Sequence, residues 1–595
     1  MSIAITRRDP LSPQSGSASS EVATSLPVKW PYIDTLYDYV EFMKYGDESQ
    51  NTGSIASLPE AHWNTPVAVI GAGAAGLVAA YELLRIGASP VVFEAHPQRL
   101  GGRLYSQPFT NTQGRPDPTT FAEMGAMRFP TSSRLLFHYI NDVFGLRTTQ
   151  AFPNPGQVPT RLYYENSVID WPAGHLCPAG FEGVYNDWLN FIEELVSPLR
   201  HAWQNHQLDE VIDIWQEYID RYKDLSFYNV LRRGISWWTE EDMNKFAALG
   251  IGSGGFGPLF PFGFLEILRI VINRMEQDQQ LLVAGSSALM QTFYTQPVTR
   301  PNGERQSLQS IDAVLFNTPV KTIVSGSDGN PIVYYANPSS GNIEARSFPA
   351  VIVATTTRSM GILGMTLHAT GSPRSVVNDS VKSAIRNIPL INSSKMFIRT
   401  ATKFWKSDPT IPQNIQMDEL PRGVYALDYP QTENGVILIS YTWGDDSSKL
   451  QGLSKEERFV QFKQAIAQVC PQFAEHMVPL NGEILNIDWQ ATDYCHGAFK
   501  LQYPGQEQNA HDLYYQFLSV LNPAVDRGVY LAGDSVSWSG GWIEGALHTG
   551  INAACAAAKR IGANLKPASP LCQSPRLYNY SSLAIGTILG DDLVK

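Results

Sequence analysis

The sequence predicts an α/β protein in which a parallel-sheet domain is assembled from separated segments of the chain. A second domain of helices and mixed strands is inserted between these segments. Two observations support this prediction. Residues 67–94 read as strand, glycine-rich turn, helix and strand, and buried strand signals of the same kind return near residues 350–354 and after residue 528. Between about residues 131 and 277 the apolar residues instead recur at helical spacing.

The first segment, VAVIGAGAAGLVAAYELLRIGASPVVFE, carries a dinucleotide-binding pattern. The strand Val67–Ile70 runs into glycines at GxGxxG spacing, and a second strand, Pro90–Phe93, ends at an acidic residue. The glycines permit a tight turn, close approach of a pyrophosphate and close helix packing, while the helix N-terminus attracts phosphate. The acidic residue is placed to accept hydrogen bonds from a ribose. The predicted contacts are Gly71, Gly73, Ala74, Ala75, Gly76, Glu94 and Ala95.

Three further blocks indicate which dinucleotide binds. They are LGGR (100–103), FAEMGAMRFP (121–130) and VYLAGDSVSWSGGWIEGALHTGINAA (529–554). Together they resemble the flavin-dependent amine oxidase superfamily, which includes monoamine oxidases and L-amino acid oxidases. The resemblance implies non-covalent FAD, and FAD is preferred over NAD because a nicotinamide enzyme needs no second phosphate-side segment. It implies further cofactor contacts at Gly102, Arg103, Met127, Arg128, Val320, Gly533, Asp534, Trp542 and Ile543.

Bulk properties favour a cytoplasmic enzyme. The 595 residues are enough for two or more domains. A net charge of −12 without a basic block argues against nucleic acid and membrane surfaces as partners. The five scattered cysteines suit neither a disulfide framework nor a zinc site. We find no apolar run long enough to span a membrane and no signal-peptide pattern.

The expected fold is a discontinuous Rossmann-like FAD-binding domain of the amine oxidase type, with an inserted mixed α/β plus helical substrate-binding domain. A helix is expected within residues 30–44, and others within 188–203, 208–222 and 264–280. Residues 313–337 are expected to form a small β-meander that leads into a buried parallel strand, Ala350–Ala354. We assign 65–130, 278–358 and 500–565 to the FAD-binding domain, and 26–64, 131–277 and 359–499 to the substrate-binding domain. Residues 1–25 are expected to be a disordered tail, and 566–595 a C-terminal tail.

An α-amino acid substrate requires a cation for its carboxylate and a slot for its side chain. Arg128 matches the arginine that L-amino acid oxidases use for the carboxylate, and its planar guanidinium binds two oxygens at once. Residues 254–264, GGFGPLFPFGF, contain Phe256, Phe260 and Phe262 and no carboxylate that could receive a cationic side chain. An apolar aromatic substrate is therefore favoured, unless a carboxylate from elsewhere reaches the pocket.

Other blocks resemble the bacterial tryptophan 2-monooxygenases in particular, across most of the chain. They are IDTLYDYVEF (33–42), GIGSGGFGPLFPFGFLEILRIVIN (250–273), SSKMFIRTATKFW (393–405), RGVYALDY (422–429), SYTWGDD (440–446), GAFKLQYPG (497–505) and SGGWIEGALHT (539–549). The resemblance implies conversion of L-tryptophan and O2 to indole-3-acetamide, CO2 and water, the first step of auxin synthesis by the indole-acetamide route.

The same resemblance implies roles for single residues. Arg128 and Tyr441 would bind the substrate carboxylate, Phe256 and Trp542 would flank the indole, and Lys395 would be the catalytic lysine near the flavin. Ordinary packing remains the alternative for Tyr441 and Phe256, and a family-wide aromatic wall for Trp542. Lysine is rarely buried in an apolar strand without a partner or a purpose, which favours function for Lys395.

Three hypotheses follow from the sequence. The first is tryptophan 2-monooxygenase. The second is an aromatic L-amino acid oxidase that releases keto acid, ammonia and H2O2, since motifs do not show whether the imino acid is retained. The third is a flavin-binding protein without catalysis, against which Arg128 and Lys395 both argue. No metal site is expected, and the preference among Trp, Phe and Met stays open. A homodimer is compatible with the sequence, which leaves the oligomeric state open.

Overall fold

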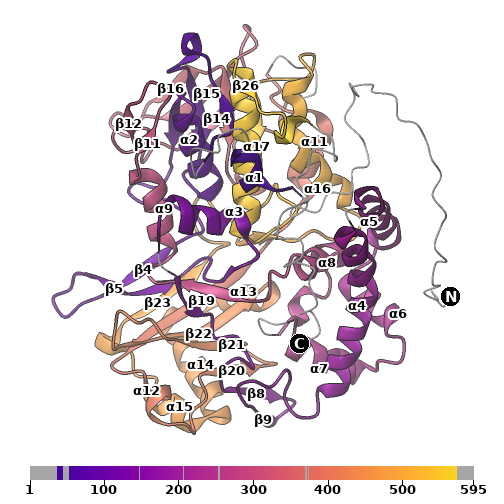
Figure 1. The fold of residues 1–595 in the computed structure, drawn as a ribbon. Coiled ribbons are helices and arrows are strands. Elements are labelled where there is room, and N and C mark those ends of the chain that lie inside the picture. The colour runs from indigo at the N-terminus through magenta and orange to yellow at the C-terminus, as the bar shows by residue number, and fades with distance from the viewer. Residues whose placement is uncertain are drawn as a thin grey trace.

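A computed structural model describes residues 37–44, 53–146, 148–205, 207–251, 255–368, 372 and 374–572 (Figure 1). The predicted tail 1–25 and the last part of the predicted C-terminal tail lie outside these residues. The parallel sheet with its helices occupies one half of the molecule, a large mixed sheet the other half, and helices α4–α8 one side (Figure 1). No helix within the described ranges is long and apolar enough to cross a membrane.

The first half is built on a five-stranded sheet with the order β13-β3-β2-β17-β25. Its strands are β2 (Pro66–Ile70), β3 (Ser89–Phe93), β13 (Val314–Leu315), β17 (Ala350–Val353) and β25 (Val529–Leu531). All four pairings are parallel. Strands from each of the three segments expected for the FAD-binding domain therefore meet in one sheet, and their carboxyl ends lie along one edge.

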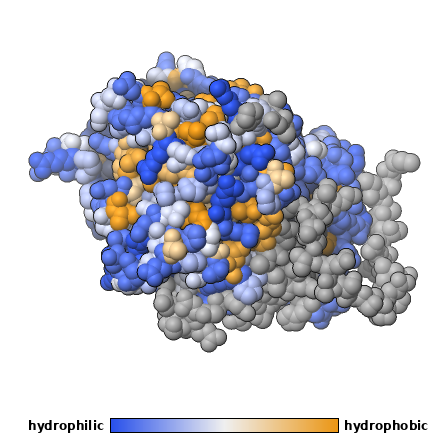
Figure 2. All heavy atoms as spheres, turned by 90° about the horizontal axis from the view of Figure 1, so that it is seen from above, coloured by the Kyte–Doolittle hydropathy of each residue, from blue (hydrophilic) through white to orange (hydrophobic). Residues whose placement is uncertain are grey.

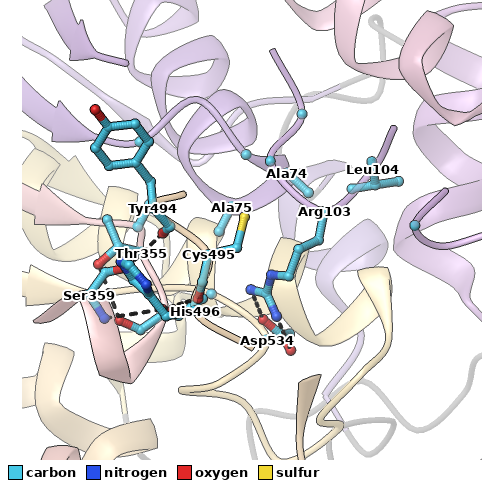
Figure 3. Close-up of a pocket in the computed structure, with 18 of the residues that line it drawn as sticks. Ala74, Ala75, Arg103, Leu104, Thr355, Ser359, Tyr494, Cys495, His496 and Asp534 are labelled. Carbon is cyan, nitrogen blue, oxygen red and sulfur yellow. Dashed lines mark hydrogen bonds and ion pairs between the residues drawn. The ribbon is translucent and has the colours of Figure 1, made fainter. Parts of the chain in front are cut away.

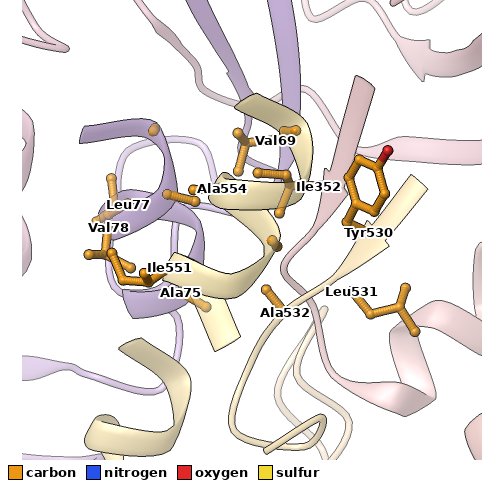
Figure 4. Packing of buried hydrophobic residues seen from close by; sticks show 14 of the residues in the cluster. Val69, Ala75, Leu77, Val78, Ile352, Tyr530, Leu531, Ala532, Ile551 and Ala554 are labelled. Atoms are coloured by element: carbon orange, nitrogen blue, oxygen red, sulfur yellow. The ribbon is translucent and has the colours of Figure 1, made fainter. Parts of the chain in front are cut away.

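Two helices from opposite ends of the chain pack against each other over this sheet. They are α2 (Ala74–Arg85), which follows the glycine turn, and α17 (Ile543–Arg560) (Figure 4). Both are alanine-rich and buried along nearly their whole length. At Gly550 of α17 a β-carbon would lie 2.5 Å from Val78 Cγ1 and 2.6 Å from the Ala75 carbonyl oxygen. Small residues therefore let the two backbones approach closely and cover the sheet.

The strand signals of residues 313–347 divide between two sheets. β14 (Val320–Ser325), β15 (Pro331–Ala336) and β16 (Ile343–Ser347) form the antiparallel meander. The prediction that residues 313–317 belong to it is wrong, because β13 instead pairs in parallel with β3. β16 was not expected, and its residues are all exposed, so no alternation of buried and exposed residues marks it.

The other half contains a seven-stranded sheet with the order β23-β19-β22-β21-β20-β8-β9. The bounds are β8 (Thr160–Tyr164), β9 (Ser167–Trp171), β19 (Ser393–Thr400), β20 (Asn414–Met417), β21 (Gly423–Leu427), β22 (Gly435–Trp443) and β23 (Ile484–Asp488). In the antiparallel pair of β19 and β22, Lys395 lies directly opposite Tyr441. Opposed residues of neighbouring strands point to the same face of a sheet, so this register brings the two predicted site residues together.

Helices form the side layer that the sequence predicts, with corrected bounds; the helix expected within residues 264–280 ends at Ile272, and Gln279–Leu282 is the strand β10. They are α4 (Glu182–Gln204), α5 (Leu208–Tyr222), α6 (Phe227–Gly234), α7 (Glu240–Leu249) and α8 (Phe264–Ile272). The helical pattern expected from residue 131 onward is wrong for its first part, which contains β7 (Thr148–Ala151), β8 and β9. Of the helix expected within residues 30–44, the described part is α1 (Tyr39–Lys44).

The remaining elements connect these layers. The hairpin of β4 (Ser106–Thr110) and β5 (Pro116–Glu123) projects from the body (Figure 1). The other strands are β1 (Ala56–Ser57), β6 (Phe129–Pro130), β10 (Gln279–Leu282), β11 (Val298–Thr299), β12 (Arg305–Gln306), β18 (Leu390–Ile391), β24 (Phe499–Lys500) and β26 (Asn564–Leu565). The other α-helices are α3 (Arg134–Phe137), α9 (Ser286–Thr295), α10 (Thr357–Ile362), α11 (Asp379–Asn387), α12 (Phe404–Ser407), α13 (Asp445–Lys449), α14 (Lys455–Val469), α15 (Pro471–His476) and α16 (Glu507–Tyr514). On the face seen in Figure 2, polar surface alternates with apolar patches.

Candidate active site

A cavity of about 420 Å³ lies at the carboxyl edge of the parallel sheet and runs toward the seven-stranded sheet. Its walls come from all three segments that build the parallel sheet, as Figure 3 shows for Ala74, Thr355 and Asp534. Most of the predicted cofactor residues line it: Gly71, Gly73, Ala74, Ala75, Glu94, Ala95, Gly102, Arg103, Val320, Gly533, Asp534, Trp542 and Ile543. Lys395 and Tyr441 line its far end.

Two glycine segments lie side by side at the start of the cavity. Gly73 and Gly101 form a parallel bridge, and the Gly101 amide donates to the Ala72 carbonyl at 2.8 Å. Gly71 turns with φ of +99°, and a β-carbon there would lie 2.9 Å from the Ala354 carbonyl oxygen. Gly73 is the N-cap of α2 and has no side chain, so the amides of the first helical turn face the cavity uncapped. These amides and glycines suit a pyrophosphate.

Glu94 holds the turn from the end of β3. Its carboxylate accepts hydrogen bonds from the backbone amides of Ala72 at 2.8 Å and His96 at 2.7 Å. Burial raises the pKa of Glu94, and the two amide hydrogen bonds lower it in part. The carboxylate thus lines the cavity one strand away from the glycine turn, which is where the sequence pattern predicts a ribose contact.

Arg103 and Asp534 join the N-terminal and C-terminal segments across the cavity (Figure 3). The guanidinium makes two hydrogen bonds to the carboxylate, one of them at 3.0 Å, and a third to the Ala498 carbonyl oxygen at 2.7 Å. The Asp534 carboxylate also accepts from the Gly541 amide at 3.4 Å. A bidentate pair of this kind is geometrically specific, so it fixes the spacing of the two segments around a ligand.

Lys395 is buried in β19, with 2% of its surface exposed. Its ammonium donates to the main-chain carbonyl oxygens of Glu123 at 3.1 Å and Gly125 at 2.5 Å. It also lies 4.7 Å from the centre of the Tyr441 ring. Burial, and next the positive charge of Arg128, lower the pKa of Lys395 to about 7, while Glu123 opposes the change. The amine therefore exchanges a proton near neutral pH, which an ordinary lysine does not.

Arg128 lies behind this end of the cavity, among aromatic rings. Its guanidinium carbon is 4.5 Å from the centre of the Phe152 ring, 5.0 Å from that of Tyr425 and 5.9 Å from that of Tyr441. Burial raises the pKa of the Tyr441 phenol, and Arg128 lowers it in part. The predicted carboxylate-binding pair, Arg128 and Tyr441, is therefore close together beside Lys395.

A layer of aromatic side chains, which includes Tyr441 and Trp443, separates this cavity from a second cavity of about 320 Å³. Tyr441 lines both cavities, and Trp443 lines the second. The Trp443 ring makes edge contacts with Tyr441 at 5.1 Å, Phe256 at 6.2 Å and Phe499 at 6.2 Å between ring centres. Phe256 and Trp542, the two residues predicted to flank the indole, both belong to or pack against the hydrophobic cluster of the helical layer.

Four predicted residues do not line the 420 Å³ cavity. Gly76 lies inside α2, where a β-carbon would be 2.0 Å from the Gly71 carbonyl oxygen, so it permits close packing as expected. Met127 and Phe256 are buried in hydrophobic clusters. Arg128 reaches the site through Tyr441 and Lys395. Contact of these four with a ligand stays a prediction.

Sequence reasoning missed several residues of the site. Trp443 is two residues from Tyr441 on one strand, hence on the same face, a signal that the alternation of β22 contained. Phe499, Trp489, Thr355, Cys495 and His496 also line the cavity. Four of them lie in the irregular stretch 489–499 and Thr355 lies in a loop after β17, and no helical or alternating pattern marks them.

The cavity fits a flavin dinucleotide. Uncapped amides and glycines suit the pyrophosphate, Glu94 suits the ribose, and an apolar, aromatic far end suits a flat ring system. Within the described ranges no group of three or more His, Cys, Asp or Glu side chains could hold a metal. Cys177, Cys470, Cys495 and Cys555 are free thiols. A cavity that suits a dinucleotide and ends at a buried lysine with a lowered pKa is typical of a cofactor-dependent redox enzyme.

Comparison with known proteins names the family. The chain matches the family described as flavin containing amine oxidoreductase over residues 74–558 and belongs to it. This confirms FAD as the cofactor and oxidoreductase as the enzyme class. Among solved structures, a putrescine oxidase variant has a TM-score of 0.61 at 16% identity over 83% of this chain and 99% of that one. Cyclohexylamine oxidase from Brevibacterium oxydans has a TM-score of 0.60 at 17% identity over 84% and 98%. Both confirm the predicted fold class.

Sequence relatives confirm the narrower resemblance. The chain is 38% identical to tryptophan 2-monooxygenase of Pseudomonas savastanoi, over 92% of this chain and 99% of the relative. It is 36% identical to tryptophan 2-monooxygenase of Rhizobium radiobacter, over 93% of this chain and 72% of the relative. A phenylalanine 2-monooxygenase precursor of a Pseudomonas species is 22% identical over 82% and 86%.

Proposed function

We propose that this chain is an FAD-dependent tryptophan 2-monooxygenase. It converts L-tryptophan and O2 to indole-3-acetamide, CO2 and water, in which one oxygen atom of O2 enters the amide and the other enters water. The names of the relatives at 34–38% identity, which align with nearly the whole chain, support the reaction. The guanidinium of Arg128 and the aromatic end of the cavity support the substrate class, an aromatic amino acid.

The chemistry that FAD would supply in this cavity is two-electron oxidation of the amino acid at Cα and delivery of those electrons to O2. The chain contributes position and charge. Arg128 binds the substrate carboxylate with its guanidinium, and the Tyr441 hydroxyl assists. Phe499 and Trp542, which line the cavity, hold the indole and exclude water, with Trp443 and Phe256 packed behind them. Lys395, whose pKa is lowered to about 7, would accept or return a proton at its buried amine during the reaction.

The cofactor is held without a covalent bond in this proposal. The cradle of Gly73, the Glu94 carboxylate and the Arg103–Asp534 pair supply phosphate, ribose and ribityl contacts. The domains follow as proposed from the sequence: residues 65–130, 278–358 and 500–565 bind FAD, and the inserted segments shape the substrate site. The fact that β2, β17 and β25 share one sheet supports this division.

One observation carries the proposal. The Arg128 guanidinium and the Lys395 amine lie beside the same tyrosine ring, Tyr441, at the aromatic end of the cavity. A simple amine has no carboxylate and needs no guanidinium there. An α-amino acid with an aromatic side chain needs both a cation and an apolar slot.

Product analysis tests the proposal. FAD-loaded enzyme is incubated with L-tryptophan under ¹⁸O2, and the products are identified by mass spectrometry. Indole-3-acetamide that carries one ¹⁸O atom, together with CO2, is the expected outcome. Indole-3-pyruvate with ammonia and H2O2 instead would establish the aromatic L-amino acid oxidase. A flavin that stays oxidised with L-tryptophan in the absence of O2 would contradict both enzymes.

A further inference from the structure

A buried cluster of charged residues lies behind Phe499 and Trp542, two aromatic residues that line the cavity. The cluster has no part in the proposed reaction. Lys500 and Glu266 are 1% and 2% exposed, and their side chains form an ion pair at 2.7 Å. Arg269, also on α8, is 1% exposed and paired with Glu507. Burying charges is costly unless each one has a partner, so such a cluster calls for an explanation.

The Lys500 ammonium joins three parts of the chain. Besides the Glu266 carboxylate on α8, it donates to the Ser537 carbonyl oxygen at 2.9 Å. The Glu266 carboxylate in turn accepts from the Gln502 amide at 3.3 Å. One cation thus connects the helical layer, the strand β24 and the loop 533–542 that carries Asp534 and Trp542.

The backbone of this region is arranged so that Lys500 controls the cavity wall. Phe499 and Lys500 are neighbours in β24, so their side chains point to opposite faces: Phe499 lines the cavity and Lys500 faces the cluster. The loop lies directly on this strand. A β-carbon at Gly540 would be 2.3 Å from the Lys500 carbonyl oxygen, and one at Gly541 would be 3.2 Å from the Phe499 ring.

The neighbouring aromatic residue strengthens the connection. Trp538 lies on the same loop and is 2% exposed. The Lys500 ammonium is 5.9 Å and the Arg269 guanidinium carbon 4.3 Å from the centre of its ring. Both cations of the cluster therefore hold the loop from beneath, four residues before Trp542.

We propose that the Lys500–Glu266 ion pair is a positioning element of the active site, which fixes Phe499 and the loop carrying Trp542 against the flavin and the substrate ring. The helical layer, through α8, thereby sets the closure of the cavity. The inference rests on the proposed function in that the closed wall retains the imino acid until it is converted to amide.

The test uses FAD-loaded protein with Lys500→Met, Glu266→Gln and both substitutions together. Each single substitution leaves a buried polar or charged group without its partner and lowers Tm; the double variant removes both charges and recovers much of the Tm. Two readouts report the wall itself. One is quenching of the bound flavin's fluorescence by iodide, and the other is the Kd of indole-3-propionate, an aromatic carboxylate that has no amine to oxidise.

We expect all three variants to show stronger iodide quenching and an indole-3-propionate Kd raised about tenfold, since small misplacements of positioning groups have effects of this size or larger. The share of keto acid among the products should rise with them. Arg399→Met is the matched control, because Arg399 is also buried at 2% exposure and is paired with Asp117. Arg399 lies near the end of β19 that is away from Lys395 and does not line the cavity. It should lower Tm without changing either readout.

The proposal is overturned if the double variant regains parental quenching and Kd together with its Tm, or if the single variants lose only Tm. These outcomes would leave the pair a purely structural one. Iodide quenching needs no substrate, so it distinguishes this failure from a failure of the proposed function, which would appear as a parent enzyme that makes no amide.

Discussion

The titration of Lys395 gives a prediction that can be worked out from the structure. Its pKa is lowered from 10.5 to about 7, first by burial and then by Arg128. At 1.36 kcal/mol per pKa unit, the gap corresponds to a cost of about 5 kcal/mol for keeping the buried amine protonated. Lys395 is 2% exposed, so solvent screens this cost little.

The sign of the pH dependence follows from linkage. The folded-state pKa is below the unfolded-state value, so between about pH 7 and pH 10 the unfolded chain binds more protons than the folded one. The contribution of Lys395 to the free energy of unfolding is therefore lowest below pH 7 and rises as the pH increases through that window. From about pH 7 to about pH 9 the rise amounts to about 2.3 kcal/mol, because the folded-state amine is still half protonated at the lower pH.

Urea unfolding of the FAD-loaded parent and of Lys395→Met measures this contribution. The stability of the parent relative to the variant should increase by about 2–3 kcal/mol between about pH 6 and about pH 9. Met396→Leu, at the next position of the same strand and without a titrating group, should differ from the parent by an amount that does not change with pH. If the free energy of unfolding of the parent differs from that of Lys395→Met by the same amount at both pH values, the lowered pKa is refuted.

Two other substitutions test the site, and a third tests the packing of α17 against α2. Arg128→Met should raise KM for L-tryptophan and slow anaerobic flavin reduction, together by about 2–5 kcal/mol, and stopped-flow reduction at the parental rate at low tryptophan would rule out the carboxylate contact. Asp534→Ala leaves Arg103 without its carboxylate partner and should lower the free energy of unfolding by about 3–5 kcal/mol. The variant should also lose FAD on gel filtration, and full retention of FAD would contradict the proposed cofactor contact. Gly550→Val places a side chain against Val78 and the Ala75 carbonyl and should destabilise the fold by at least about 1–3 kcal/mol, which a thermal melt with unchanged Tm would disprove.

The nucleotide-binding part of the fold was predictable because its signals are local. The glycine turn after β2, the helix α2 and the acidic end of β3 occur within one short stretch, and each has a physical requirement that few residues satisfy. The long amphipathic helices α4, α5 and α8 were predictable for the same reason, since their 3.6-residue period is visible along the chain.

Other elements depend on partners that are distant in the sequence. The two-residue strand β13 is a strand by pattern, but whether it joins the meander or the parallel sheet is decided by its pairing with β3. β8 and β9 belong to a sheet whose next strand, β20, comes some 250 residues later, and the following helices dominated the local pattern.

The site shows the same division. Lys395, Tyr441 and Arg128 were each predicted from a resemblance, but their proximity comes from the register of β19 with β22 and from the packing of residues 121–130 against it. The lowered pKa of Lys395 arises first from its burial in this packing and then from the nearby charge of Arg128, and the value has no counterpart in the sequence. The Lys500–Glu266 pair likewise joins residues that are far apart, and neither one is distinctive in its own segment.

The split construction of the parallel sheet has a consequence for biosynthesis. β2 emerges from the ribosome early, but its neighbour β17 follows nearly 300 residues later, and the edge strand β25 and the covering helix α17 come only after residue 528. The apolar faces of β2 and α2 therefore stay exposed during most of translation. Exposed apolar surface of this kind is prone to aggregation and is bound by chaperones. The binding site for the vitamin-derived cofactor is incomplete until about the last tenth of the polypeptide has been synthesised. Yellow colour in a preparation of nascent chains therefore reports that the whole molecule has been completed.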